Sequence, residues 1–195
     1  MQYKTSNIQV FLDKNNEAFI GEFELYSLLS DFSCPKNLEV EHFIKSNAIE
    51  FTKKKQSVTY IVSDNEANIL GFFALTIKPV SVRASKISKT MSKKLARTSV
   101  YNENTKTYSS SAYLIAQLGK NYAIEKEKRI SGNDLLNVAL EKIEEIQYQI
   151  GGVTEFLECE ENEFLISFYT SKGFKIFDSR KSEAGKVLYQ LIKVI

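Results

Sequence analysis

The sequence predicts a mixed α/β fold in which helices pack on a mixed sheet, and two observations carry that prediction. In residues 58–77, VTYIVSDNEANILGFFALTI, two runs rich in β-branched and aromatic residues flank the polar turn SDNEAN, which is the pattern of an antiparallel hairpin. In the second half of the chain, apolar strand-like runs alternate with segments of helical periodicity in the order β-α-β-α-β. Such an alternation after a hairpin favours one sheet with helices packed on it.

Each predicted element has its own signal in the residues. A helix is expected in residues 37–51, because apolar residues recur there at three- and four-residue spacings after Pro35 and the candidate cap Asn37. A second helix is expected in residues 132–150, before a pair of glycines. A third stops at Gly173, a residue that adopts the left-handed conformation readily. Apolar runs predict the remaining strands, at residues 112–122, 153–159, 174–178 and 187–195.

Length and composition indicate one globular domain that covers residues 1–195, with 43% hydrophobic and 26% charged residues. The N-terminal stretch MQYKTSNIQVFLDKNN lacks the apolar segment of a signal peptide, and the longest nearly apolar run, ILGFFALTI, is too short to cross a bilayer. We therefore expect a cytoplasmic protein without a membrane partner.

The cysteines and the single histidine do not have metal-ligand spacing. Cys34 and Cys159 lie far apart in the chain and are interpreted as reduced thiols. Cys159 is expected to be a small buried apolar residue, because no histidine lies within sequence reach to activate it. His42 on an amphipathic helix is expected at the surface or at its boundary. The prediction for a metal site is none.

A basic insertion is predicted at about residues 83–110. Between residues 83 and 106 the chain carries seven basic side chains and one acidic side chain, Glu103, although the net charge of the whole chain is only +2. The segment is expected to leave the core and to be partly helical around residues 89–98. Any argument for a nucleic-acid partner depends on these basic residues, which are Arg83, Lys86, Lys89, Lys93, Lys94, Arg97 and Lys106.

The turn KRISGND, residues 128–134, is the candidate place for an anion. It joins a strand to the N-terminus of a long helix, where unpaired N–H groups and the positive end of the helix dipole favour a negative charge. Gly132 lets the backbone approach a ligand closely, and Arg129 adds positive charge. Ser131 or Asn133 is expected either to cap the helix or to contact the anion. The alternative is that this segment is only a turn.

Two motifs make the chain resemble the Gcn5-related N-acetyltransferases, from about residue 37 to the end. The family's pyrophosphate-loop pattern is Arg or Gln, two residues, Gly, one residue, then Gly or Ala. Arg129 and Gly132 match its first two places, whereas Asp134 departs from the third. The second motif is Asn, Tyr seven residues later, and Gly-Phe after a three-residue gap. It is matched in full by Asn162, Tyr169, Gly173 and Phe174.

The resemblance implies a fold, a cofactor and a mechanism. The fold has a mostly antiparallel central sheet, helices on both faces, and a strand pair that splays apart to form the cleft for acetyl-coenzyme A. An amide near Leu118 would stabilise the oxyanion, and Tyr169, with a reference pKa of about 10, would protonate the leaving thiolate without a shifted pKa. From the residues themselves, Glu158 and Glu160 alternate on the strand before Asn162, and one of them is a candidate base acting through water, with a solvated strand end as the alternative. The implied cofactor-binding residues are Gln117, Leu118, Lys120, Arg129, Ile130, Ser131, Gly132, Asn133, Asp134 and Asn162.

The residues leave the acceptor and two alternatives open. Small amines, a protein N-terminus or lysine, and the aminoacyl group of a charged tRNA all offer a primary amine. The last acceptor would make the protein a translation-blocking toxin, for which the basic insertion is the only local support. An alternative of another class is a non-catalytic module that binds coenzyme A or a partner protein. Tyr169 itself has the alternative of a core aromatic residue whose hydroxyl faces water. A homodimer is also left open.

Overall fold

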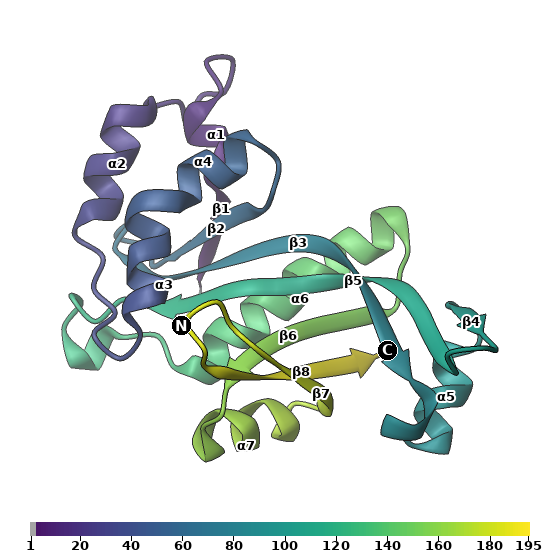
Figure 1. Cartoon of the computed structure of the whole chain (residues 1–195). Coiled ribbons are helices and arrows are strands. Elements are labelled where there is room, and N and C mark those ends of the chain that lie inside the picture. The colour runs from purple at the N-terminus through teal and green to yellow at the C-terminus, as the bar shows by residue number, and fades with distance from the viewer. Residues whose placement is uncertain (1–2) are drawn as a thin grey trace. The chain divides into compact units, whose positions relative to one another are not determined.

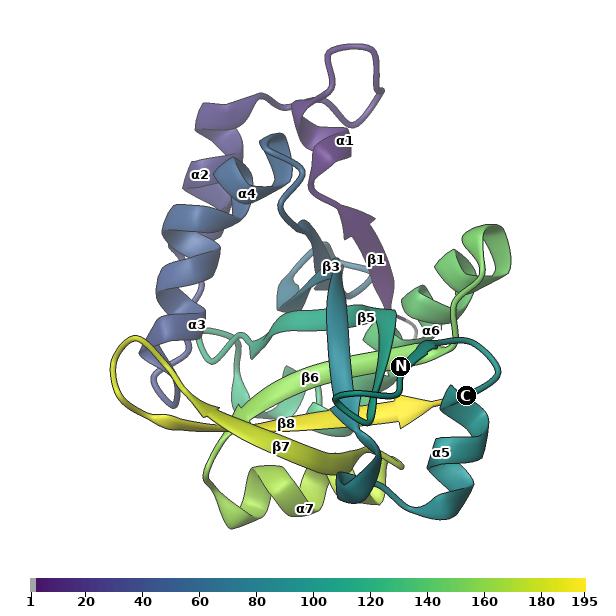
Figure 2. The same ribbon diagram turned by 45° about the vertical axis from the view of Figure 1, so that its right-hand side comes forward.

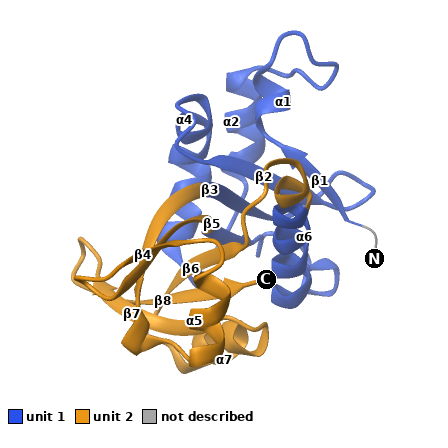
Figure 3. Ribbon diagram, turned by 90° about the vertical axis from the view of Figure 1, so that its right-hand side faces the viewer, with its two compact units in different colours: residues 1–76, 116–144 blue, residues 77–115, 145–195 orange. Residues whose placement is uncertain are grey.

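The computed structural model describes residues 3–195, and the chain divides into two compact units. Unit 1 comprises residues 1–76 and 116–144, and unit 2 comprises residues 77–115 and 145–195 (Figure 3). Strands β3 (Ile69–Arg83) and β5 (Thr107–Lys120) and helix α6 (Gly132–Ile150) each contribute residues to both units. Each unit is described by itself below.

The strands form a mixed sheet of eight, ordered β1-β2-β3-β5-β6-β8-β7, with β4 paired to β5 off this path. The β1–β2, β2–β3, β4–β5, β6–β8 and β7–β8 pairs are antiparallel, whereas β5 and β6 pair in parallel. The predicted mixed, mostly antiparallel sheet is therefore confirmed. The remaining strands are β1 (Lys4–Asn7), β2 (Val58–Ser63), β4 (Val100–Asn102), β6 (Thr154–Glu160), β7 (Lys175–Lys181) and β8 (Val187–Val194).

Helices α1, α2, α3 and α4 lie grouped together in unit 1 (Figures 1 and 2). They span Gln9–Leu12, Glu22–Ser30, Leu38–His42 and Ala48–Lys53, and a π-helix, Phe43–Asn47, joins the last two. Asn37 caps α3 as predicted, because its side chain accepts hydrogen bonds from the N–H groups of Glu39 and Val40. The apolar sides of these helices pack with β2 and β3 in a core that includes Leu25, Leu29, Ile44, Ile61 and Phe72.

In unit 2, strands β6, β8 and β7 lie side by side with helix α7 (Glu163–Ser171) against them (Figure 2). Helix α7 ends where Gly173 takes a φ of 90°, a left-handed conformation that other residues adopt at a cost. Helix α5 (Lys89–Leu95) belongs to the predicted insertion, yet its Leu95 is buried in a core cluster with Val80, Phe156 and Ile192. This segment is therefore packed at Leu95, where the sequence predicted an excursion from the core.

Most elements agree with the sequence predictions, and the differences are informative. Strand β3 extends to Arg83, well beyond the predicted hairpin, and β5 begins at Thr107, before its predicted apolar run. The β3 extension, KPVSVR, carries Val80 and Val82 among polar residues, and the β5 extension, TYSSS, is mostly polar, so neither forms a continuous apolar run. Strand β1 and helices α1 and α2 were not predicted. Within residues 3–195, no helix is both long and apolar enough to cross a membrane.

Candidate functional site

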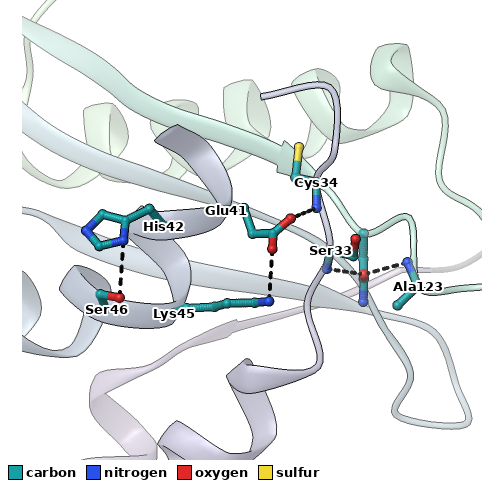
Figure 4. Close-up of polar contacts among 8 residues, drawn as sticks. Ser33, Cys34, Glu41, His42, Lys45, Ser46 and Ala123 are labelled. Carbon is teal, nitrogen blue, oxygen red and sulfur yellow. Dashed lines mark hydrogen bonds and ion pairs between the residues drawn. The ribbon is translucent and has the colours of Figure 1, made fainter. Parts of the chain in front are cut away.

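In unit 1, the loop that follows β5 is fixed by the buried side chain of Asn121. Its Oδ1 accepts hydrogen bonds from the N–H groups of Ser33, at 3.1 Å, and Ala123, at 3.0 Å, and its Nδ2 donates to the carbonyl of Ile69 at 2.8 Å. The N–H of Tyr122 donates to the carbonyl of Ser33 at 2.7 Å. The loop after β5 is thus tied to the segment that precedes α3, part of which Figure 4 shows.

Removal of the Asn121 side chain should loosen this loop. We expect Asn121→Ala to lower the free energy of unfolding by about 1 to 3 kcal/mol, because it removes three hydrogen bonds to part-buried backbone groups. Urea denaturation measures the loss, and hydrogen exchange at Ser33 and Ala123 localises it. As a control, Asn15→Ala removes a hydrogen-bonded but exposed asparagine and should change stability little. Equal losses in the two variants would contradict this role of Asn121.

Glu41, on α3, binds the backbone of the preceding segment at Cys34. Its Oε2 accepts from the Cys34 N–H at 2.6 Å, and its Oε1 lies 3.0 Å from Lys45 Nζ (Figure 4). The hydrogen bond from Cys34 and then that from Lys45 hold the pKa of Glu41 below its usual value. His42 is exposed, as predicted, and its Nδ1 lies 3.4 Å from Ser46 Oγ (Figure 4). Glu41 is therefore engaged in structural contacts as a carboxylate.

Arg129, the first residue of the pyrophosphate-loop motif, is bound to the same loop. Its Nε donates to the carbonyl of Ile124 and its Nη2 to that of Tyr122, both at 2.7 Å. The guanidinium carbon lies 5.2 Å from the centroid of the Tyr122 ring. Arg129 thus shapes the loop with two of its donors while still supplying positive charge there.

The N-terminus of α6 is capped by Ser131, whose hydroxyl is hydrogen-bonded to Asp134. Ser131 Oγ accepts from the Asp134 N–H at 3.0 Å and donates to Asp134 Oδ2 at 2.8 Å. The hydroxyl of Tyr3 donates to the same Oδ2 at 3.2 Å. The carboxylate that departs from the family motif is therefore held by two hydroxyl groups. Gly132 and Asn133 occupy the first turn, where backbone N–H groups lack intrahelical acceptors.

The other predicted cofactor residues of unit 1 are placed as follows. Gln117 and Leu118 are half-buried on β5, and Ile130 is fully buried before α6. Lys120, at the end of β5, is also half-buried, and its Nζ lies 5.8 Å from the Tyr122 ring centroid. Burial, together with the charges of Lys36 and Arg129, lowers the pKa of Lys120. Their roles in cofactor binding stay predictions.

In unit 2, Tyr169 occupies the last turns of α7 with its ring packed and its hydroxyl uncommitted. The ring lies edge-on to Phe168, at 5.0 Å between centroids, and to Phe174, at 6.3 Å. Within residues 3–195, the hydroxyl donates no hydrogen bond to the protein. Burial, with a smaller contribution from Cys159, raises the pKa of Tyr169 to about 12. The sequence argument for Tyr169 as a proton donor did not require a shifted pKa, and the shift arises because packing leaves the phenol less hydrated than a free tyrosine.

The raised pKa of Tyr169 predicts a specific alkaline instability. Folding favours the neutral phenol, because the pKa of Tyr169 in the folded state is about 12, above the reference value of 10.0. This stabilisation is complete below pH 10 and is lost as the pH rises through the folded pKa. The loss in the free energy of unfolding is on the order of 2 kcal/mol. Tyr169→Phe should therefore lose less stability than the wild type between pH 9 and about 11, as measured by urea denaturation. Parallel losses would show that Tyr169 does not contribute.

The two candidate bases of unit 2 are both engaged with cations. Glu158 accepts from Arg180 Nε at 2.7 Å and Nη2 at 2.5 Å, and from Gln190 Nε2 at 2.8 Å. Burial alone would raise its pKa, but the hydrogen bonds from Arg180 and Gln190 bring it below the usual value. Glu160 Oε1 lies 2.9 Å from Lys186 Nζ. Glu158 is therefore a weaker base than a free carboxylate. A base role for Glu158 or Glu160 stays a prediction.

Asn162 and Cys159 have structural contacts. The Asn162 side chain caps α7, accepting from the N–H groups of Phe164 at 2.9 Å and Leu165 at 3.2 Å. Burial raises the pKa of Cys159 to about 11. Both cysteines are free thiols, and Cys159 is buried as predicted; Cys34 is buried as well. Within residues 3–195, no group of three or more His, Cys, Asp or Glu side chains is arranged to hold a metal ion.

Unit 2 also has a pocket of about 310 Å³ that the sequence did not predict. Its lining combines the apolar side chains of Phe156 and Phe177 with the Glu158–Arg180 ion pair and Gln190. The pocket residues come from β3, β6, β7 and β8, so no local motif could have signalled them. In unit 1, the contact between Lys36 and Tyr122 was likewise not predicted, because the two residues are far apart in the sequence.

No family model and no curated protein sequence matches this chain. Among solved structures, AtaT complexed with acetyl-methionyl-tRNAfMet is 17% identical with a TM-score of 0.63, covering 96% of this chain and 94% of that chain. AtaTR bound with AcCoA is 16% identical with a TM-score of 0.56, covering 97% and 92%. The NatC complex bound to Gag peptide and CoA is 16% identical with a TM-score of 0.50, covering 100% and 99%.

These structures match nearly the whole of this chain, although few residues are identical. Two features of this chain's own structure agree with that likeness, namely its strand order and the position of the two motifs at the start of α6 and in α7. The resemblance predicted a mixed, mostly antiparallel sheet, and the structure has one, in which β5 and β6 pair in parallel. The chain therefore has the fold of the Gcn5-related N-acetyltransferases.

Proposed function

We propose that this protein is an acetyl-coenzyme A-dependent N-acetyltransferase that acts on a primary amine. The observation that carries the proposal is Tyr169. It stands at the family's motif position in α7, with its ring packed by Phe168 and Phe174 and its hydroxyl without a hydrogen-bond partner in residues 3–195. A hydroxyl in these surroundings is neutral at physiological pH and keeps its proton to donate.

The likeness to solved structures supports the choice of coenzyme. AtaTR is bound with AcCoA, and the NatC complex is bound to CoA. In this chain, the first-turn N–H groups at Gly132 and Asn133 would receive the pyrophosphate, because an anion is stabilised at a helix N-terminus. The Asp134 carboxylate weakens that attraction, and its hydrogen bonds from Ser131 and Tyr3 spread its charge. The main chain of β5 near Leu118 would hold the pantetheine arm and the oxyanion.

In the proposed reaction the amine nitrogen attacks the thioester carbonyl, the N–C bond forms, and the C–S bond breaks. Tyr169 donates its proton to the departing sulfur, and the phenol is restored by the proton that the amine loses. Because a thiol with a pKa of about 8.5 is a stronger acid than Tyr169, a complete early transfer would be uphill. We therefore infer a hydrogen bond from Tyr169 that strengthens as negative charge develops on sulfur.

Coenzyme binding is tested by thermal stability. At a concentration about 100 times its dissociation constant, acetyl-coenzyme A should add about 2.7 kcal/mol to the free energy of unfolding. Gly132→Val should abolish this gain without unfolding the protein, because a branched side chain obstructs the approach of an anion to the first turn. Gly185→Ala, in an exposed turn of unit 2, is the control. Its φ of 79° makes the substitution costly to stability, but the gain on coenzyme binding should remain. No stabilisation of the wild type would refute the proposed coenzyme.

A second, finer candidate for the acceptor is a charged tRNA, and helix α5 favours it. Lys89 and Lys93 are four residues apart and share one helix face, and Arg97 follows the helix; all three are exposed. Across residues 3–195, no ion pair neutralises any of them. AtaT, whose structure holds acetyl-methionyl-tRNAfMet, has the same fold. Exposed basic side chains on a helix bind the phosphate backbone of nucleic acids, so we place charged tRNA ahead of small amines and protein amines as the acceptor.

A further inference from the structure

Three cations surround one aromatic ring in unit 1. The Nζ of Lys36 lies 5.5 Å from the centroid of the Tyr122 ring, the Nζ of Lys120 lies 5.8 Å from it, and the guanidinium carbon of Arg129 lies 5.2 Å from it. We call these four residues the Tyr122 cluster. They come from the segment before α3, the end of β5 and the start of the turn before α6.

The Tyr122 cluster has no acidic partner. In the part of the chain that the structure describes, no ion pair joins a carboxylate to Lys36, Lys120 or Arg129. Glu41, the carboxylate bound to the neighbouring backbone at Cys34, pairs with Lys45 instead. Burial and the two neighbouring cations lower the pKa of Lys120, as expected where like charges repel.

The backbone around the cluster is built to hold these charges in place. The side chain of Asn121 and the N–H of Tyr122 fix the loop to Ser33, and Arg129 donates to the carbonyls of Tyr122 and Ile124. Flexible surface lysines move apart to reduce repulsion, whereas a fixed ring and guanidinium give them a common attachment. An ordered group of cations that lacks a counter-ion is suited to bind an anion.

We propose that the Tyr122 cluster is a phosphate-binding site, distinct from the first turn of α6, for a phosphate group carried by a substrate. The inference rests on the proposed function for its two candidate sources. One is the 3′-phosphate of coenzyme A, and the other is a backbone phosphate of a nucleic-acid acceptor. Lys36 and Lys120 supply the charge and the hydrogen-bond donors, and Arg129 and Tyr122 position them.

The test uses the double variant Lys36→Ala/Lys120→Met in the full chain. Arg129 is left intact, because it also holds the loop. The matched control is Lys14→Ala/Lys126→Ala, which removes two exposed lysines that have no ion-pair partner in residues 3–195. Calorimetry with coenzyme A and with dephospho-coenzyme A, and tRNA binding as a function of salt, distinguish the two sources.

If the coenzyme supplies the phosphate, the double variant should bind coenzyme A about tenfold more weakly and dephospho-coenzyme A with unchanged affinity. If the acceptor supplies it, coenzyme affinity should be unchanged and the slope of log affinity against log salt for tRNA should become shallower by about 0.7 to 0.9 for each phosphate that is no longer bound. Either result supports the site. Wild-type behaviour of the double variant in both assays would overturn it.

A third measurement separates this inference from the proposed function. Inorganic phosphate, compared with chloride at equal ionic strength, should raise the melting temperature of the wild type and of the control but not of the double variant. If the wild type bound neither coenzyme nor tRNA, the acetyltransferase proposal would fail. The shift in melting temperature with inorganic phosphate would then be the test of the phosphate-binding site. Equal stabilisation of all three proteins by phosphate would overturn the inference.

Discussion

Tyr169→Phe should lower the rate of acetyl transfer by about 10²- to 10⁴-fold, the range typical of a positioned acid or base. The substitution keeps the ring and its contacts with Phe168 and Phe174 but removes the only proton that the side chain can donate. Because the hydroxyl has no partner within residues 3–195, its loss should cost little stability near pH 7. Steady-state turnover at saturating acetyl-coenzyme A is the measurement.

The control for this substitution is Tyr148→Phe, since Tyr148 is 94% exposed on α6. It should leave turnover, coenzyme affinity and stability unchanged. A Tyr169→Phe variant that kept full turnover but unfolded more easily would show that Tyr169 is a core aromatic residue whose hydroxyl is structural. The alternative interpretation of this residue from the sequence would then be correct.

Reversal of the charge on the exposed face of α5 should remove a nucleic-acid acceptor selectively. We expect Lys89→Glu/Lys93→Glu/Arg97→Glu to abolish acetylation of charged tRNA at physiological salt and to make the salt dependence of tRNA binding shallower by about 0.7 to 0.9 for each phosphate that the helix no longer binds. Acetylation of a small amine should continue. Lys94 is left unchanged because its Nζ donates to the carbonyl of Val194 at 3.1 Å and anchors the helix.

The control for the α5 variant reverses Lys4, Lys14 and Lys175, which are exposed in other parts of the chain. It changes the net charge by the same amount, so it accounts for long-range electrostatic effects. If the two triple variants acetylated charged tRNA equally well, α5 would be only a solvated surface. A tRNA acceptor would then lose its structural support in this chain.

The sequence predicted those features that depend on local patterns. The helix periodicity before Gly173 placed Tyr169 at the end of α7, and Asn37 was recognised as a cap by its position before a helix. The turn before α6 was also found, although only the structure shows that Asp134 bonds to Ser131 and Tyr3. Helix α2 was not predicted because its apolar residues lie on several sides of the helix and form no single stripe. Phe23, for example, is 81% exposed.

Features that depend on contacts distant in sequence could not be predicted. Lys36 and Tyr122 are brought together by hydrogen bonds between loops, and no motif connects them. The engagement of Glu158 by Arg180 depends on the pairing of β6, β8 and β7. Likewise, the raised pKa of Tyr169 follows from packing around its ring, which spacing alone does not reveal.

Transfer of a labelled acetyl group from acetyl-coenzyme A tests the central claim most directly. The wild type and Tyr169→Phe are incubated with acceptor panels of polyamines, peptides with free N-termini and charged tRNA, and both label transfer and free coenzyme A are followed. We predict that the wild type labels at least one amine while releasing an equal amount of coenzyme A, and that Tyr169→Phe does so far more slowly. Coenzyme binding without transfer to any acceptor would contradict the account and indicate a non-catalytic binding module.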